Sequence, residues 1–254
     1  MEDFNSGWST VPSAGSRIVV TGAAGGLGRV LTAALEQLHC EVVGIDQPGT
    51  SGASNVRMVE ADLTDNDAAR RAVEQAMSAL GGIDAVVGAA AVVDTVHAAA
   101  TFAMDEFRAD IEANLVAQFA VAQAAYPGLT ASNSPSIVFV SSLAALDGLP
   151  GQVSYAAAKA GLLGMTRTLA AEWLGVGIRV NAVAPGLFAT PKVLAMPAGA
   201  RERLLAGVPM KRLATVGEVV GSVLYLLSPA AGYTTGEVLR LDGGSNLNCS
   251  GLYR

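Results

Sequence analysis

The feature that most restricts this chain is an apolar strand that runs directly into a glycine-rich turn and then a helix. Residues 17–20 are a short apolar run, residues 21–28 have the sequence TGAAGGLG, and residues 29–38 have a helical pattern. Glycines in such a turn let the backbone approach a pyrophosphate, and the helix N-terminus offers free amides and a positive dipole end. The segment therefore predicts a dinucleotide phosphate site.

The rest of the chain alternates short apolar runs with helical segments. Further strands are predicted at residues 41–45, 55–60, 82–87, 137–140, 178–184 and 237–241, with helices between them. This alternation predicts right-handed crossovers and a parallel sheet covered by helices on both faces, which is an α/β fold. Residues 187–216 contain three prolines, so we expect an irregular insertion there, placed as a substrate lid.

Length and composition set further bounds. The chain has 254 residues, 51% of them hydrophobic and 15% charged, which suits one large domain at residues 17–254. Residues 1–16 are acidic and polar, unlike a signal peptide, and are expected to form a flexible leader. No apolar run reaches the roughly 20 residues that span a bilayer.

Charge and cysteine content exclude other classes of protein. The formal net charge of −6 argues against nucleic acid as a partner, because that role calls for a basic patch. Cys40 and Cys249 are too few and too far apart to indicate a disulfide framework or a metal site. We therefore expect a cytoplasmic protein with a small-molecule substrate and no membrane partner.

Two residues on a predicted helix have a spacing that suits acid–base chemistry. Tyr155 and Lys159 are four positions apart in an Ala-rich helix after the strand 137–140, so they share a face. A fixed cation beside a phenol favours the phenolate and lowers its pKa from about 10. Ser142, at the strand end, is placed to hydrogen-bond the same reacting oxygen. Because Tyr and Lys are common on helices, the pair indicates catalysis only together with the serine and the glycine turn.

A carboxylate at the end of the second predicted strand bears on the choice of cofactor. Asp46 follows the apolar run 41–45, where it can accept both hydroxyls of an adenine ribose and would repel a 2′-phosphate. The glycine turn supplies no cation for such a phosphate, and Gln47 is neutral. The sequence therefore predicts NAD rather than NADP; the alternative is an Asp that only caps a loop.

Together these motifs resemble the compact branch of the short-chain dehydrogenase/reductases, and the likeness runs from residue 17 to residue 244. The glycine turn also fits the extended, epimerase-type branch, but 254 residues leave no room for that branch's extra substrate domain. The resemblance implies one doubly wound, Rossmann-type domain with seven parallel strands in the order 3-2-1-4-5-6-7. It also implies a homotetramer or a homodimer.

The family's functional positions carry over residue by residue. The resemblance places the catalytic tetrad at Asn114, Ser142, Tyr155 and Lys159. It implies cofactor contacts from Gly22, Gly26, Leu27, Gly28, Asp46, Asp62, Leu63, Ala89, Tyr155, Lys159, Pro185, Gly186 and Thr190. It implies substrate contacts from Ser142, Ala144, Gln152, Tyr155 and Leu187. In the implied mechanism Tyr155 takes the alcohol proton, Lys159 lowers the phenol pKa and holds the nicotinamide ribose, and Asn114 keeps a water in a proton relay.

One motif departs from the family pattern. After the fourth predicted strand the family usually has Asn-Asn-Ala-Gly, whereas this chain has Gly88-Ala89-Ala90-Ala91. We expect the missing amides to remove hydrogen bonds that steady the central sheet and the loop facing the ribose. The proton-transfer chemistry is expected to survive, because this motif donates no proton.

These observations predict an NAD(H)-dependent oxidoreductase that interconverts a secondary alcohol and a ketone. The apolar residues expected around the site favour an alicyclic or hydroxysteroid-like substrate. The nearest alternative is a 3-oxoacyl-thioester reductase, which usually goes with NADP and a basic docking patch; its candidates are Arg201, Arg203, Lys211 and Arg212. Alternatives from other classes are a redox-silent NAD-binding regulator and a non-redox lyase or isomerase.

Overall fold

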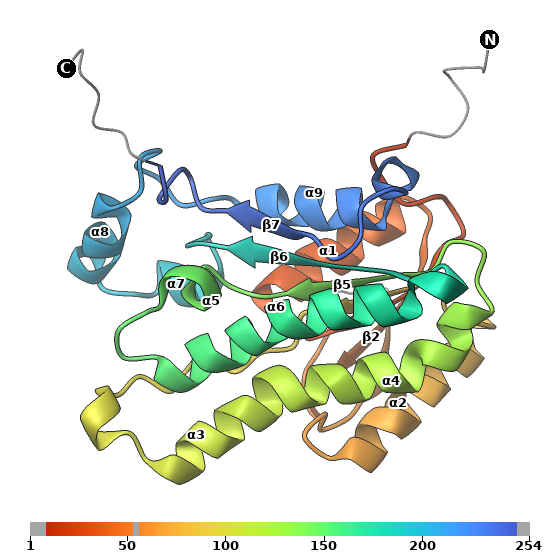
Figure 1. The fold of residues 1–254 in the computed structure, drawn as a ribbon, viewed down its shortest axis with the longest axis horizontal. Helices are drawn as coiled ribbons and strands as arrows, with labels where there is room; N and C mark the ends of the chain where they lie inside the picture. Colours follow the sequence, from red (N-terminus) through yellow and green to blue (C-terminus); the bar gives the residue numbers. More distant parts are fainter. Residues whose placement is uncertain (1–8, 53–55, 248–254) are drawn as a thin grey trace.

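The structure is a computed structural model that describes residues 9–52 and 56–247, and it is built on one parallel sheet (Figure 1). The seven strands lie in the order β3-β2-β1-β4-β5-β6-β7, so the predicted topology is confirmed. They are β1 (Arg17–Thr21), β2 (Glu41–Asp46), β3 (Arg57–Glu60), β4 (Ala85–Gly88), β5 (Ser136–Val140), β6 (Arg179–Pro185) and β7 (Val238–Leu241).

Helices cover both faces of this sheet. They are α1 (Gly26–Gln37), α2 (Asn66–Leu80), α3 (Met104–Ile111), the π-helical turn η2 (Glu112–Val116), α4 (Ala117–Thr130), α5 (Ala144–Asp147), α6 (Val153–Trp173), α7 (Pro191–Leu194), α8 (Ala198–Ala206) and α9 (Val216–Leu227). Short 3-10 turns lie at η1 (Ala99–Thr101), η3 (Leu174–Val176) and η4 (Pro229–Ala231). Figure 1 shows α1 and α9 on one face and α2, α4 and α6 on the other.

The core is divided into two layers because successive side chains of a strand point to opposite faces. In β1, Ile18 and Val20 pack under α1 and α9, whereas Val19 packs with the helices of the other face. The central strands β4, β5 and β6 are buried along their whole length. Covered on both faces, they read as continuous apolar runs, as parallel strands of this kind usually do.

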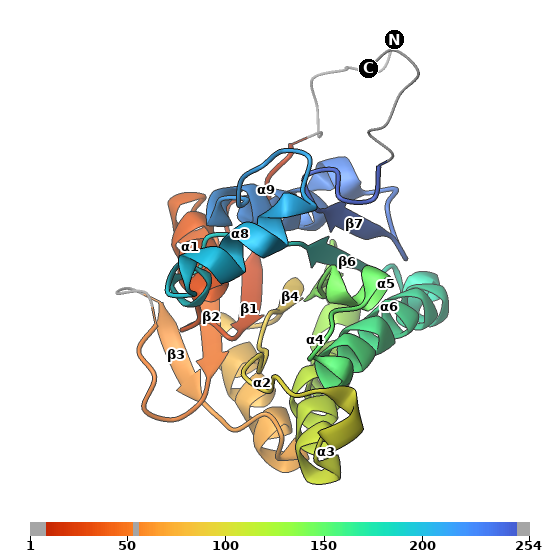
Figure 2. The same cartoon turned by 90° about the vertical axis from the view of Figure 1, so that its left-hand side faces the viewer.

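The loops that matter for function meet at the carboxyl edge of the sheet, which Figure 2 views from the front, with α8 crossing near the strand ends. Contrary to the expected irregular insertion, residues 187–216 contain the helices α7 and α8. Pro191 is the first residue of α7 and Pro197 directly precedes α8. A proline at a helix start loses no hydrogen bond and has the right φ, so these prolines begin helices instead of preventing them.

Three expectations from composition can be compared with the part of the chain that the structure describes. Of the predicted leader, residues 1–8 lie outside the described part, whereas Ser9 accepts a hydrogen bond from the Ala230 amide at 3.0 Å and Gly15 donates one to His39 at 2.8 Å. Within the described ranges, every helix is too short or too polar to cross a membrane. Cys40 is buried as a free thiol, and Cys249 lies beyond the described residues.

Candidate active site

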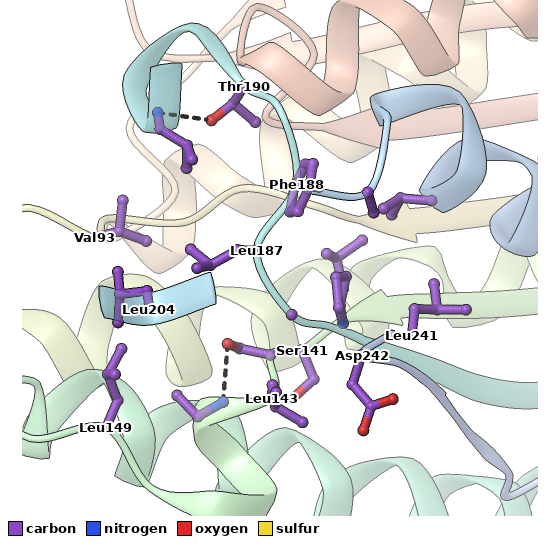
Figure 3. Close-up of a pocket in the computed structure, with 18 of the residues that line it drawn as sticks. Val93, Ser141, Leu143, Leu149, Leu187, Phe188, Thr190, Leu204, Leu241 and Asp242 are labelled. Atoms are coloured by element: carbon purple, nitrogen blue, oxygen red, sulfur yellow. Dashed lines mark hydrogen bonds between the residues drawn. The ribbon is translucent and has the colours of Figure 1, made fainter. Parts of the chain in front are cut away.

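A large cavity opens at the carboxyl edge of the sheet, with a volume of about 1280 Å³. Its walls come from the turn after β1, the loops after β4 and β5, α6, and the segment after β6 (Figure 3). The predicted site residues that line it are Gly22, Gly26, Leu27, Gly28, Ala89, Ser142, Ala144, Gln152, Tyr155, Lys159, Pro185, Gly186, Leu187 and Thr190. The predicted residues Asp46, Asp62, Leu63 and Asn114 are not part of this lining.

In the segment from the turn after β1 to the first turn of α1, the backbone is packed too closely for a side chain at Gly22 or Gly28. Gly22 has φ of 68°, and a Cβ there would lie 2.7 Å from Ala90 Cα. A Cβ on Gly28 would lie 2.1 Å from the Gly22 carbonyl oxygen. Helix α1 begins after Gly25 with no side-chain cap and no acidic residue in its first turn, so its first amides and its positive dipole end are available. These features fit the pyrophosphate of a dinucleotide cofactor.

We expect Gly28→Ala to lower affinity for the dinucleotide by at least about tenfold and to destabilise the fold by roughly 1–3 kcal/mol. The added methyl group would meet the Gly22 oxygen and Ala23 Cα at 2.1 and 2.6 Å, so the backbone of the turn must move. Fluorescence titration with NADH and thermal unfolding measure the two effects. Gly164→Ala is the matched control, because its Cβ meets nothing within 4 Å. Equal losses in both variants would contradict this explanation.

Two carboxylates lie at or just after the ends of β2 and β3, and the first of them contacts the glycine turn. Asp46 accepts hydrogen bonds from the amides of Ala24 and Gln47, each at 2.8 Å. It therefore ties the end of β2 to the turn, which is compatible with both the predicted ribose contact and the loop-capping alternative. Asp62 accepts from the hydroxyl and amide of Thr64 at 2.7 and 3.0 Å, and these hydrogen bonds lower its pKa.

The predicted catalytic side chains converge where β5 meets α6. Tyr155 is half-buried, and the Lys159 ammonium lies 5.7 Å from the centre of its ring. Lys159 is 1% exposed and donates to the Val140 carbonyl at 2.9 Å. The Ser141 hydroxyl donates to the Lys159 carbonyl at 2.8 Å, which holds α6 against the end of β5. The Ser142 hydroxyl accepts from the Ala144 amide at 3.1 Å, and Ser142 and Tyr155 both line the cavity.

Burial shifts the pKa values of the tyrosine and the lysine in opposite directions. It raises the pKa of the Tyr155 phenol, and the Ser142 hydroxyl acts against this rise. It lowers the pKa of Lys159 to about 7. The net shift of the Tyr155 pKa is therefore upward, and the predicted lowering by Lys159 remains a prediction for the site with its charged lysine. Desolvation favours the neutral form of each group, and the ammonium faces a carbonyl instead of a carboxylate.

Asn114 lies in the π-helical turn η2 and is fully buried. Its amide nitrogen donates to the carbonyls of Val92 and Asp110, both at 3.0 Å, and its oxygen accepts from the Val92 amide at 3.0 Å. Both amide protons are thus used, one on the loop after β4 and one on the Asp110 carbonyl in α3. A water in the predicted relay would have to use the second lone pair of the Asn114 oxygen or a backbone carbonyl.

Sequence reasoning did not identify Asp110, although it is next to the catalytic elements. This carboxylate is 4% exposed, accepts from the Thr95 hydroxyl at 3.0 Å, and also accepts from the Ser154 hydroxyl, which directly precedes Tyr155. It therefore links the loop after β4 to the start of α6. An acidic residue four positions before a buried Asn114 was the available signal, because both side chains then face the same way.

The far end of the cavity is mainly apolar. Figure 3 shows Val93, Leu149, Leu187 and Leu204 gathered on one side. Across from them, Arg240 pairs with Asp147 at 3.0 Å and also with Asp242. Sequence analysis missed this cluster, since β7 and α5 are remote in the chain. The two carboxylates raise the pKa of Arg240, which stays protonated, and their negative charges offset its positive charge. Arg240 therefore adds no net positive charge to the cavity.

Comparison with curated proteins gives consistent similarities. The chain matches the family described as enoyl-(acyl carrier protein) reductase over residues 22–246. It is 35% identical to the 3-oxoacyl-(acyl-carrier-protein) reductase FabG of Thermotoga maritima, covering 91% of this chain and 97% of that protein. It is 34% identical both to the acetoacetyl-CoA reductase of an Acinetobacter species, covering 89% and 96%, and to the cis-4-hydroxycyclohexanecarboxylate dehydrogenase of Sinomonas cyclohexanicum, covering 89% and 94%.

Solved structures agree with this result. The crystal structure of levodione reductase superimposes with a TM-score of 0.86 and 26% sequence identity, covering 93% of this chain and 100% of that one. The similarity in fold therefore extends over nearly the whole chain.

Proposed function

Because this chain belongs to the short-chain dehydrogenase/reductase family of oxidoreductases, which use a nicotinamide dinucleotide, we propose that it interconverts a secondary alcohol and a ketone with NAD(H). The observation that carries the proposal is the convergence of Ser142, Tyr155 and Lys159 on the cavity that also holds the glycine turn. A redox-silent regulator would not need these three side chains in contact with that cavity.

When bound, a nicotinamide dinucleotide accepts or supplies the hydride, and the protein's own groups handle the proton. Ser142 donates a hydrogen bond to the substrate oxygen, and Tyr155 exchanges the proton with that oxygen. Since burial raises the pKa of Tyr155, the phenol is its main form at neutral pH and can donate directly in ketone reduction. The charged form of Lys159 stabilises the phenolate left behind.

An apolar substrate of the alicyclic kind is supported by the leucine- and valine-lined end of the cavity. The relative that is named for cis-4-hydroxycyclohexanecarboxylate has such a ring alcohol as its substrate. A 3-oxoacyl-thioester reductase is the second candidate, because most of the similar curated proteins are named for thioester substrates.

The cationic residues considered for thioester docking are mostly engaged locally. Arg201 donates to the Leu194 carbonyl at 3.1 Å, and Lys211 donates to the Ala206 carbonyl at 2.7 Å. Arg212 forms two hydrogen bonds with Glu218, at 2.7 and 2.8 Å. The Glu218 carboxylate offsets the charge that Arg212 offers to an acidic carrier, whereas the carbonyl partners of Arg201 and Lys211 leave those residues charged, so the patch is reduced but still basic.

A spectrophotometric screen tests the proposal. Purified protein is assayed with cyclic and linear secondary alcohols, the matching ketones and acetoacetyl-CoA, each with NAD(H) and NADP(H). The expected result is NADH-linked turnover that is fastest with a ring substrate. Faster turnover of acetoacetyl-CoA with NADPH would favour the thioester alternative. Product without a change in NADH absorbance would indicate a lyase or isomerase, and cofactor binding without turnover on any substrate would indicate a regulator.

We expect Asp46→Asn to reduce the preference for NAD over NADP by about tenfold. The substitution removes the charge that repels a 2′-phosphate but keeps an oxygen that can accept from the Ala24 amide. The ratio of kcat/KM for the two cofactors measures the effect. Asp65→Asn serves as the control, because that carboxylate caps α2. An unchanged ratio in the Asp46 variant would mean that this carboxylate only caps the turn.

A further inference from the structure

The loop after β4 has no polar side chain of its own between Gly88 and Val93, yet its backbone is well hydrogen-bonded. The Thr21 hydroxyl accepts from the amides of Ala89 and Ala90 at 3.1 and 3.2 Å. Asn114 pairs with both backbone groups of Val92. The hydrogen bonds expected to be lost with the missing amides are therefore supplied by side chains from other elements.

Gln118 supplies the remaining support. It is fully buried in α4, one helical turn after Asn114, and its amide nitrogen donates to the Ala90 carbonyl at 2.8 Å. Residues four apart share a helix face, and Ala90 and Val92 are two apart on the extended loop. The two amides thus clamp alternate residues of the same segment. Among the described residues, no hydrogen-bond partner reaches the Gln118 side-chain oxygen.

The position of that oxygen accounts for the glycine at the end of β4. A Cβ on Gly88 would lie 2.4 Å from the Gln118 oxygen and 2.9 Å from a ring carbon of Phe139. The carboxamide of Gln118 thus occupies the space that a side chain at Gly88 would need. A polar oxygen is buried there without a partner, which costs stability, so packing alone would favour an apolar side chain at Gln118.

A displacement of Ala90 would be transmitted to the glycine turn. The Cα and amide of Ala90 lie so close to Gly22 that a Cβ on that glycine would approach each to 2.7 Å. Ala89 and Ala91, on either side, line the cavity. The hydrogen bond from Gln118 therefore holds the part of the loop that supports the phosphate turn from behind.

We propose that Gln118 is a positioning residue for the cofactor site: its carboxamide replaces, from α4, the side-chain amide that the loop after β4 lacks, and Gly88 is a glycine to leave room for it. The inference rests on the proposed function only in that the positioned site binds a dinucleotide. It deepens that function by naming a residue outside the cavity on which cofactor affinity depends.

The first test replaces Gln118 with leucine, which has a similar size but no donor. We expect NADH affinity to fall about tenfold, with kcat at saturating NADH within about threefold of wild type. Hydrogen–deuterium exchange of residues 86–94 should accelerate, whereas exchange of α9 should not change, which verifies that the variant is folded. The control is Gln123→Leu, because Gln123 is exposed on the same helix. Wild-type affinity and exchange in the Gln118 variant would overturn the proposal.

The second test moves the side-chain carboxamide from α4 to the end of β4. Gly88→Asn alone should weaken NADH binding at least tenfold, since two carboxamides then compete for one space. Combined with Gln118→Ala, it should recover part of the lost NADH affinity and melting temperature, because only the Phe139 ring, 2.9 Å from the added Cβ, then still has to shift. Additive losses in the double variant would overturn the proposal. If wild type bound neither NADH nor NADPH, the proposed function would fail, while exchange and melting would still test the positioning role.

Discussion

Tyr155→Phe is expected to reduce turnover by about 10³-fold or more while NADH affinity stays within about twofold of wild type. Phenylalanine keeps the ring that Lys159 approaches at 5.7 Å and removes only the oxygen that exchanges the proton. Because burial raises the pKa of the phenol, the protonated form, which donates in ketone reduction, predominates at neutral pH. Steady-state kinetics in the reduction direction and fluorescence titration with NADH separate the chemical step from binding.

Tyr126→Phe is the control for that experiment. Tyr126 packs against Trp173 with ring centres 5.0 Å apart and does not line the cavity, so removing its hydroxyl should leave turnover unchanged. If the Tyr155 variant kept more than about a tenth of wild-type turnover, proton transfer would have to be assigned to another group. A strong loss of NADH affinity would instead mean that the phenol mainly organises the cofactor site.

Lys159→Met is expected to abolish turnover and, at the same time, to make the fold more stable at neutral and acidic pH. Burial holds the pKa of Lys159 at about 7, whereas the ordinary value is 10.5. Charging this group in the folded state is therefore unfavourable by a few kcal/mol, which methionine avoids. Losing the hydrogen bond to the Val140 carbonyl offsets about 1 kcal/mol of the gain. The melting temperature should rise by roughly 5–10 °C at pH 6.

The pH dependence of this difference has a definite sign. Between pH 7 and about 10 the unfolded chain binds the lysine proton and the folded chain does not, so wild-type stability rises with pH in this window. The advantage of the methionine variant should thus be constant below pH 7 and shrink toward pH 9. Thermal unfolding at several pH values measures it, with Lys192→Met, at a half-exposed lysine, as the control. An advantage that did not change with pH would show that Lys159 is not titrating near 7.

Local sequence patterns predicted the parallel α/β sheet and several residues of the cavity, and the family resemblance implied the order of the strands. The glycine turn, the strand end at Ser142 and the four-residue spacing of Tyr155 and Lys159 are encoded within short stretches. Parallel strands then bring such stretches to one edge whatever the details of packing. The helices α7 and α8 were not predicted. In the sequence alone, a proline at the start of a helix cannot be told from a proline within an irregular loop.

Tertiary structure alone decided which groups lose water and which distant side chains meet. The pKa directions of Tyr155 and Lys159 follow from burial, which no spacing rule reports. Gln118 reaches Ala90 across 28 positions, and Ser154 reaches Asp110 across 44. The sequence by itself thus determined the fold class and the chemistry carried on each strand end, since these depend on residue type and period. Desolvation and long-range contacts arise only when the helices pack on the sheet. The pKa shifts of the site and the side chains that hold its loops could therefore be seen only in the folded chain.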